Sequence, residues 1–315
     1  MSGLNGTNPS LNDASLSSTY GYIPTESIAI LFIVLFSIST ILHVGQAVFS
    51  RMWWLLPTAG LCGVMEILGW SARLWSSISP LMNTPFIIQI TSTILAPTPL
   101  VAANFVILGR IIVSLGPAYS RLSPKWYTIV FCSCDVISLV VQSVGGAMAS
   151  IASGNNEDPT PGGNIMLGGI IFQMATITIY VICAIEFFVR YFKRRPVRSV
   201  PLNAADGKES SIRGYMDKRL KIMSIGLSFS TVCLFIRSIY RTIELVDGWN
   251  GKIITTQVYF NVLDGAMIVL AMYTLNFVHP GVFLKSSGMS ERDSSDEFLA
   301  MKAAKAYGHS NDSTA

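Results

Sequence analysis

Seven long runs of apolar residues, separated by short polar segments, dominate the chain. Each run has about 20 residues or more, enough for an α-helix to cross a hydrocarbon layer roughly 30 Å thick. The pattern predicts seven transmembrane helices, at residues 26–49, 53–77, 84–113, 126–152, 164–190, 220–243 and 253–278. The fold class that we expect is therefore an all-α integral membrane bundle of seven transmembrane helices.

Lysine and arginine are distributed unevenly between the segments that join these helices. The segments after the first, third and fifth helices are basic, most densely over residues 193–221. The segments after the second, fourth and sixth helices contain one basic residue, Lys252. Basic loops stay in the cytoplasm, so the N-terminus is predicted outside and the C-terminus inside. We expect an extracytoplasmic segment at 1–25, a membrane domain at 26–280 and a flexible cytoplasmic tail at 281–315.

Composition supports lipid as the main solvent. Of 315 residues, 51% are hydrophobic and 13% charged, about half the roughly 25% charged share of a soluble domain. The net charge of +4 comes from basic residues gathered beside the apolar runs, where they set orientation. We therefore exclude nucleic acid as a partner and expect the lipid bilayer instead.

The third apolar run is the longest and contains two prolines, Pro97 and Pro99, near its middle. Each proline removes one helical hydrogen bond, so a kink is expected there. Such a kink in mid-membrane is often next to a cavity.

Charged side chains inside the runs are the main candidates for function. An ionisable group at the bilayer centre costs about 2.5–3.5 kcal/mol on insertion scales, so such groups usually face a partner or an aqueous cavity. Spacings of three, four and seven residues place them in stripes on single helix faces. With two glutamines, they form the predicted substrate-binding set: Glu66, Arg73, Asp135, Gln142, Gln173, Arg237, Arg241, Glu244 and Asp264.

We expect these stripes to face one another inside the bundle, with an outer basic layer above a deeper acidic one. Arg237 and Arg241 would suit a phosphate or carboxylate, because a guanidinium binds such groups in bidentate fashion. Glu244 and Asp264 would equally neutralise them. The alternative is a structural role, in which polar groups hydrogen-bond across helices for about 0.6 kcal/mol each.

Sequence motifs of common enzymes are missing from the chain. It contains no GxxxxGK[ST] phosphate loop and no HExxH helix, and its three histidines are dispersed. All five cysteines fall inside predicted helices. We therefore expect no enzyme activity, no metal and no cofactor.

Several motifs occur in an order that resembles a known family. They are Ile94 to Pro97 followed by residues 102–110, Asp135 with Gln142 and Gly145-Gly146, Gly168 with Gln173, Arg237 to Glu244 with Gly248, Asp264, and His279-Pro280-Gly281. Over roughly residues 20–285, the chain resembles the fungal RTA-like family, also called lipid-translocating exporters. The resemblance implies a seven-helix protein that translocates or exports amphiphiles such as sphingoid long-chain bases, or confers resistance to toxic ones.

Two functions follow as hypotheses from these patterns. In the first, the charged interior binds the headgroup of a lipid-like molecule, and a cationic amine pairs with Glu66, Asp135 or Asp264. In the second, the protein is a seven-helix lipid sensor or receptor that signals to the cytoplasm. Either function needs a membrane; we expect the plasma membrane, with an internal membrane as the alternative.

Overall fold

The computed structural model describes residues 20–155, 157–197, 214–248 and 251–284. Within these ranges the secondary structure is helical, without strands. Seven helical spans are long and apolar enough to cross a membrane: Glu26–Phe49, Trp53–Ile78, Asn83–Leu115, Pro124–Gly154, Thr160–Phe192, Lys218–Asp247 and Gln257–Phe283. The prediction of an all-α, seven-helix, multi-pass membrane protein is confirmed. The predicted cytoplasmic tail from residue 285 onward lies outside the described residues.

Four of the spans are single helices, and three are built from consecutive pieces. The single helices are α2 (Glu26–Phe49), α6 (Pro124–Gly154), α7 (Thr160–Phe192) and α8 (Lys218–Asp247). The second span has a 3₁₀ turn (Trp53–Leu55), a π-helical stretch (Leu56–Gly60) and α3 (Leu61–Ile78). The third joins α4 (Asn83–Leu95) to α5 (Pro97–Leu115). The seventh comprises α9 (Gln257–Tyr259), a π-helical segment (Phe260–Ala266), α10 (Met267–Phe277) and α11 (Pro280–Phe283).

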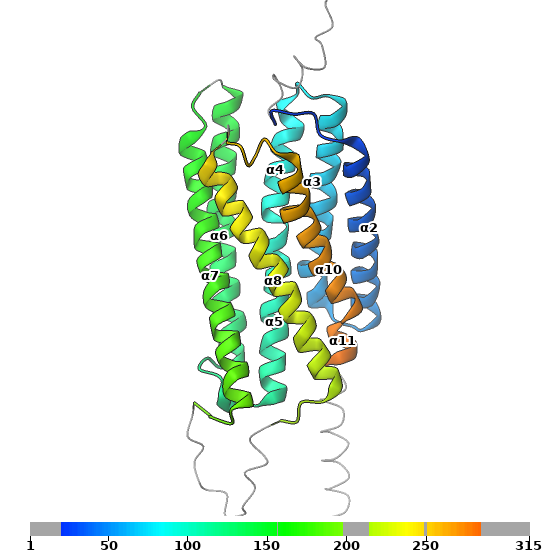
Figure 1. The fold of residues 1–315 in the computed structure, drawn as a ribbon, viewed down its shortest axis with the longest axis vertical. Coiled ribbons are helices and arrows are strands. Elements are labelled where there is room, and N and C mark those ends of the chain that lie inside the picture. The colour runs from blue at the N-terminus through cyan, green and yellow to red at the C-terminus, as the bar shows by residue number, and fades with distance from the viewer. Residues whose placement is uncertain (1–19, 156, 198–213, 249–250, 285–315) are drawn as a thin grey trace, which may run out of the picture.

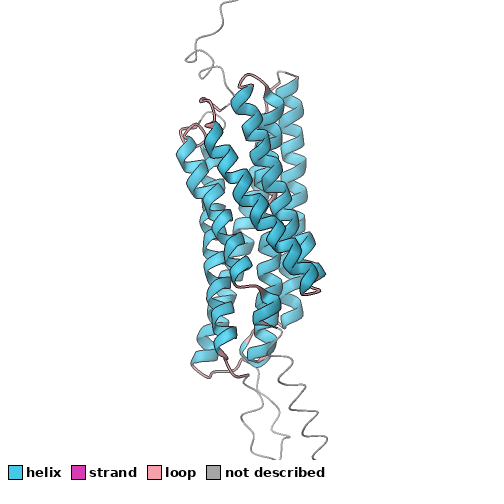
Figure 2. Ribbon diagram, turned by 90° about the vertical axis from the view of Figure 1, so that its right-hand side faces the viewer, coloured by secondary structure: helices cyan, strands magenta, loops and turns pink. Residues whose placement is uncertain are grey.

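The helices form one elongated bundle. In Figure 1, the α6–α7 pair lies on one side and α2 on the other, while α8 runs diagonally across the face between them. Helix α8 packs against α10, α7 and α5. After a quarter turn the helices still run between the same two ends (Figure 2). We call the end where Tyr20 and the start of α2 lie the N-terminal end.

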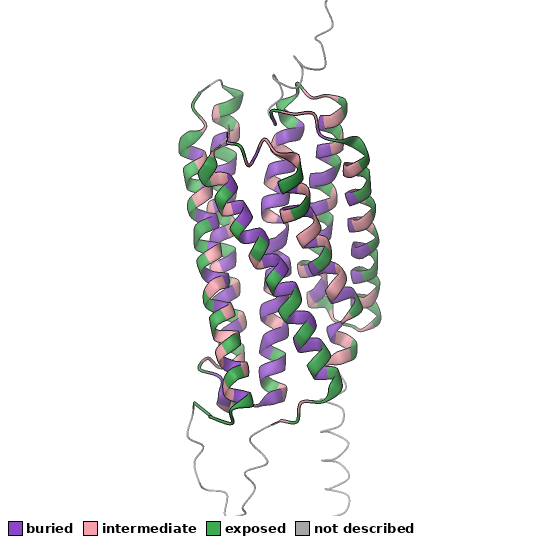
Figure 3. Ribbon diagram, in the orientation of Figure 1, coloured by how far each residue is buried: buried purple, intermediate pink, exposed green. Residues whose placement is uncertain are grey.

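Burial separates an apolar outer surface from a polar interior. Helix α5 is buried along most of its length (Figure 3), whereas α2, α6 and α7 expose rows of isoleucine, leucine and valine. Such rows suit contact with acyl chains, because lipid tails are as apolar as the side chains. All seven charged residues of the predicted set are at most 5% exposed. The expectation that they point away from lipid is confirmed.

Small residues allow α6 and α7 to approach closely. A Cβ atom added at Gly145 would collide with the backbone nitrogen of Met166, and one at Gly162 would collide with the backbone of Ala149. The Ser138 hydroxyl also donates a 2.6 Å hydrogen bond to the Gly169 carbonyl across this interface. Close packing of small residues is a main source of helix association in membranes, where no hydrophobic force draws helices together.

The seventh span begins four residues later than the apolar pattern predicts. Helix α8 ends at Asp247, and the capping residue Gly248 adopts a φ of +81° that favours glycine. The following turn is held by the side chain of Asp247, whose Oδ2 accepts from the Ile253 backbone N–H at 3.0 Å. Residues 253–256 are thus apolar enough to extend the pattern but belong to the turn, and the helix starts at Gln257.

Candidate functional site

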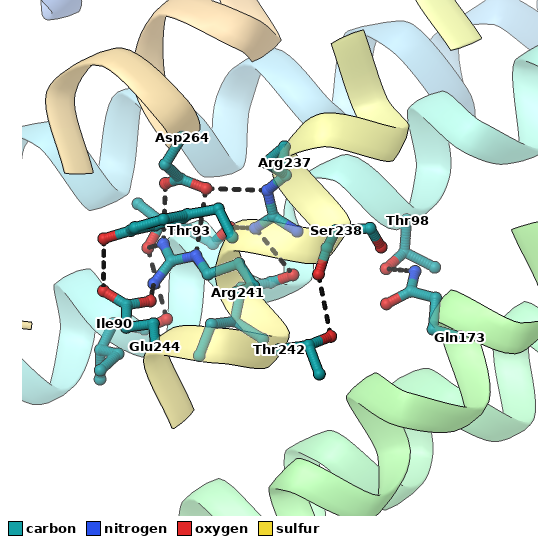
Figure 4. Close-up of polar contacts among 12 residues, drawn as sticks. Ile90, Thr93, Thr98, Gln173, Arg237, Ser238, Arg241, Thr242, Glu244 and Asp264 are labelled. Carbon is teal, nitrogen blue, oxygen red and sulfur yellow. Dashed lines mark hydrogen bonds and ion pairs between the residues drawn. The ribbon is translucent and has the colours of Figure 1, made fainter. Parts of the chain in front are cut away.

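Four charged side chains from α8 and the seventh span form a connected group in the bundle interior. Asp264 accepts from Arg237 Nε at 2.8 Å and from Arg241 Nη2 at 2.7 Å, through different carboxylate oxygens (Figure 4). Arg241 Nη1 also donates to Glu244 Oε2 at 2.7 Å. We call Arg237, Arg241, Glu244 and Asp264 the ionic network. Its two guanidinium groups and two carboxylates sum to zero charge, so the expected pairing is confirmed for these four residues.

The break in the third span supplies the next partner. Pro97 has no N–H, so the carbonyl of Thr93, four residues earlier, has no helical donor. Arg237 Nη2 donates to that carbonyl at 2.5 Å. Arg241 Nη2 donates to the Thr93 hydroxyl at 2.8 Å. The helix interruption lies at Ala96, where the prolines predict it, and it gives the arginines a neutral acceptor.

Asp264 lies in the π-helical segment Phe260–Ala266. A π-helical turn holds an additional residue, which shifts the side chains that follow, and such turns are frequent at functional sites. The next residue, Gly265, has no room for a side chain, because a Cβ atom there would run into the Trp70 and Phe32 rings. The local backbone therefore places the carboxylate of Asp264 between the two arginines.

Glu66, on α3, lies beside the ionic network without joining it by a hydrogen bond. Its side chain is completely buried, and the charges that act on it are those of Asp264, Arg237 and Arg241. Trp70, one turn further along α3, is close to it. Neither carboxylate oxygen of Glu66 has a hydrogen-bond partner in the part of the chain that the structure describes.

Arg73 is surrounded by aromatic rings instead of carboxylates. Its guanidinium carbon lies 4.5 Å from the ring centre of Phe260 and within 6 Å of those of Tyr20, Tyr22 and Trp70. Its Nη2 donates to the Tyr22 hydroxyl at 2.7 Å. Each contact of this kind contributes about 0.5–2 kcal/mol, more when water is excluded. Arg73 has no ion pair among residues 20–155, 157–197, 214–248 and 251–284.

Tyr20 closes this cage at the N-terminal end of the bundle. Its hydroxyl donates to Gln89 Oε1 at 3.1 Å and lies 3.2 Å from the Ser76 hydroxyl. Burial raises the pKa of Tyr20 to about 12, although Arg73 acts in the opposite direction. The phenol thus keeps its proton at neutral pH and serves as a donor. The segment before α2 is thereby tied to α3 and α4.

The predicted glutamines belong to a second polar group, between α6, α7 and α5. Gln142 Nε2 donates to Gln173 Oε1 at 3.0 Å, and Gln173 Nε2 donates to the Thr98 hydroxyl at 2.9 Å. Asp135, seven residues before Gln142, is 2% exposed, and its oxygens have no hydrogen-bond partner within the described ranges. Within the described residues, Asp135 forms no ion pair with the arginines of the ionic network.

The predicted set therefore divides into three groups. Glu66 lies beside the ionic network and Arg73 lies in its aromatic cage. Asp135 is on the face of α6 that carries Gln142, without a hydrogen bond to the glutamines in the described ranges. The expected separation into a basic and an acidic layer is wrong for Asp264, which bonds directly to both arginines. Sequence reasoning also missed Thr93 and Tyr240, whose hydroxyl donates to Glu244 Oε1 at 2.8 Å. Thr93 carried a readable signal, since it stands four residues before Pro97.

A cavity opens next to the ionic network at the N-terminal end. It has a volume of about 480 Å³ and lies between the start of α7 and the end of α8, with Glu244 in its lining. The only charged side chains among its lining residues within the described ranges are Asp158 and Glu244, both acidic. Hydrogen bonds from the hydroxyl and backbone N–H of Thr160 lower the pKa of Asp158, so this carboxylate stays ionised. We call this cavity the acidic vestibule.

The described part of the chain has His, Cys, Asp and Glu side chains, which are the usual protein ligands of metal ions. It contains no group of three His, Cys, Asp or Glu side chains that could hold a metal ion. The five cysteines all lie in that part and are unpaired.

Comparison with known proteins decides the family. A family model described as RTA1 like protein matches residues 60–287, a stretch that contains the ionic network, the aromatic residues of α3 and the acidic vestibule. The chain belongs to the RTA1-like family. No solved structure matches this member of the family.

Three curated relatives of this RTA1-like protein come from Saccharomyces cerevisiae. The sphingoid long-chain base transporter RSB1 (strain ATCC 204508 / S288c) is 29% identical over 297 residues, which cover 88% of this chain and 77% of RSB1. Protein RTA1 of the same strain is 26% identical over 276 residues, 80% of this chain and 81% of RTA1. Protein RTM1 is 25% identical over 209 residues, 66% of this chain and 62% of RTM1. The resemblance to this family that the sequence motifs indicated is confirmed.

Proposed function

We propose that this protein moves cationic single-chain amphiphiles across or out of the membrane, and that the acidic vestibule binds their headgroup. The observation that carries the proposal is the lining of the vestibule, whose charged side chains in the described ranges, Asp158 and Glu244, are both acidic. Its volume of about 480 Å³ is within the roughly 300–1,000 Å³ of small-molecule sites. A sphingoid long-chain base, which carries an amine on a single chain, is the first candidate.

Glu244 is the residue best placed to bind the amine. Glu244 is a lining residue of the vestibule, and its buried carboxylate joins the ionic network through Arg241. If Glu244 turns to a ligand, Arg241 keeps its bond to Asp264, so the guanidinium group still has a carboxylate partner. Arg237 and Arg241 are already neutralised by carboxylates, which favours a cationic headgroup over a phosphate or carboxylate.

A groove along the same two helices offers a path for the apolar chain. It has a volume of about 170 Å³ and is lined mainly by apolar side chains of α7 and α8, with Phe235 at one end of the α8 portion. Glu244 and Phe235 are nine residues apart on α8, about 14 Å along the helix axis. One leaflet of a bilayer has a hydrocarbon depth of about 15 Å. A headgroup at Glu244 would therefore leave the chain beside this groove.

The family relationship supports the same substrate class. RSB1 is named as a sphingoid long-chain base transporter. We infer from the basic loops that the N-terminal end, and with it the vestibule, faces away from the cytoplasm. The membrane that we expect is the plasma membrane, where export would lower the cellular content of a toxic base.

The proposal is tested with purified protein in liposomes. A fluorescent long-chain base is added to one side, and its arrival in the other leaflet is followed over time. We expect the protein to speed this movement, and Glu244→Gln to slow it by about tenfold or more, because one hydrogen bond between charged groups contributes about 1.5–3 kcal/mol.

The matched control is Glu186→Gln. Glu186 is also on a span, but it pairs with Arg121 and Arg190 near the opposite end of α7. Its substitution leaves the vestibule unchanged and should preserve the rate. Movement no faster than in protein-free liposomes would contradict the proposal; binding of the base without movement would instead identify a sensor.

A further inference from the structure

We propose that Glu66 is a proton-binding site, and that it releases its proton when a cationic headgroup binds at Glu244. The inference rests on the proposed function, because it concerns how that function is driven. It would make the movement of a cation in one direction depend on the movement of a proton in the other.

The first observation is the isolation of the Glu66 carboxyl group. It is completely buried, and neither oxygen has a hydrogen-bond partner in the described part of the chain. The indole N–H of Trp70, which lies close to it, is likewise unpartnered in these ranges. An ionised carboxylate without a partner in an apolar interior costs several kcal/mol or more, and a buried acid avoids this cost by holding a proton. A proton needs no cavity, whereas a larger ligand would.

The second observation is the charge of the surroundings. The ionic network is neutral by itself, with Arg237 and Arg241 balanced by Glu244 and Asp264. An ionised Glu66 beside it would add one uncompensated negative charge. In the empty protein the neutral, protonated form of Glu66 therefore fits its surroundings.

The other elements packed around α3 do not change this balance. The titratable groups that act on Glu66 are Asp264, Arg237 and Arg241, with Cys62 one turn away on α3. Helix α4 has no charged residue. On α2 the histidine, His43, is bonded to the Met272 carbonyl at 3.1 Å. Arg73 is seven residues from Glu66, about 10 Å along α3, and is held by Tyr22 and the aromatic rings.

Binding of a cation at the vestibule would make the ionised form of Glu66 the favoured one. A cation at Glu244 adds one positive charge to a network that reaches Asp264 through Arg241. Loss of the Glu66 proton restores neutrality, because the carboxylate then balances the added cation. The proton leaves to water or buffer, and it returns when the cation departs. The two events are linked through charge without direct contact between the ligand and Glu66.

The test measures proton release on binding of dodecyltrimethylammonium, a single-chain cation whose own charge cannot titrate. Titration calorimetry of the purified protein at one neutral pH, in two buffers of different ionisation enthalpy, gives the number of protons released. We expect about one proton per bound cation for the wild type and for Glu186→Gln, and none for Glu66→Gln. The wild-type measurement stands even where the Glu66 variant does not fold.

The outcomes separate this inference from the proposed function. Equal heats in the two buffers, with binding retained, would overturn the proton site and leave the proposed function in place. Release of one proton by folded Glu66→Gln would place the proton elsewhere and also overturn the inference. Absence of both binding and movement of long-chain bases in liposomes would remove the proposed function, and this inference with it.

Discussion

Arg237 donates a hydrogen bond of 2.5 Å to the backbone carbonyl of Thr93. The carbonyl is free because Pro97, four residues later, has no N–H to offer it. The same arginine donates to Asp264, so a break in the third span and a charge in the seventh are joined by one side chain of the sixth. Proline here creates a polar site as well as an interruption.

Replacing Pro97 by alanine should weaken this connection. The new N–H would compete with Arg237 for the Thr93 carbonyl, and α4 and α5 would become one continuous helix. We expect transport of long-chain bases to fall several-fold while thermal stability changes little, since a helical hydrogen bond replaces the one that Arg237 loses.

Pro99→Ala is the matched control for this prediction. It returns a donor to the carbonyl of Leu95, which is four residues before Pro99 and has no bond to Arg237 in the described contacts. Transport should stay near the wild-type rate. Equal losses in both variants would show that the shape of the span matters and the Thr93 carbonyl does not.

Two buried aspartates should differ in how much stability the protein loses when their charge is removed. Asp264 binds two arginines, and breaking a buried pair by removing one partner costs about 3–5 kcal/mol. Asp264→Asn should therefore lower the melting temperature and the abundance of the protein in the membrane. Asp135 has no hydrogen-bond partner in the described ranges, so Asp135→Asn should lower neither. A stable Asp264→Asn variant would contradict the role given to the ionic network.

The close contact of α6 and α7 gives a test of packing. Gly145→Ala places a methyl group against the backbone of Met166, which cannot move without separating the helices. We expect a loss of stability of about 1–3 kcal/mol from overpacking. At Gly168 an added Cβ meets nothing within 4 Å, so Gly168→Ala should be neutral or stabilising by about 0.5–1 kcal/mol. Thermal melting in detergent compares the two; equal stability would contradict the packing account.

The orientation inferred from the basic loops is tested by labelling. Thr160 and Lys193 lie at opposite ends of α7, and both are exposed. A membrane-impermeant thiol reagent should label Thr160→Cys on intact cells and Lys193→Cys only after the membrane is opened, with the wild type as the control for native cysteines. The reverse pattern would place the vestibule in the cytoplasm.

The fold was largely predictable because lipid imposes a simple rule. A span must be apolar and helical throughout its length, since unsatisfied backbone groups are too costly in hydrocarbon. The same rule identified the seven buried charges, because each stands out against an apolar run. Only the ends of the spans differed, as at residues 253–256, where the side chain of Asp247 holds a turn that hydropathy does not report.

The partners of those charges were less predictable. Helix periodicity places Glu66 and Arg73 on one face but does not say what faces them across the bundle. The structure places a neutral carbonyl opposite Arg237 and aromatic rings around Arg73, and it puts Asp135 apart from the arginines. The π-helical segment around Asp264 also changes the direction of the side chains that follow, which a regular period of 3.6 residues cannot anticipate.

The acidic vestibule as a cation site is tested most directly by the reactivity of Leu167→Cys, a position in its lining. Its rate of modification is measured with a positively charged and a negatively charged thiol reagent of equal size, with and without a long-chain base. We predict that the positive reagent reacts several-fold faster and that the base slows it. Glu244→Gln should reduce the preference for the positive reagent and remove the protection by the base. Equal rates for the two reagents, with no protection by the base, would contradict the account.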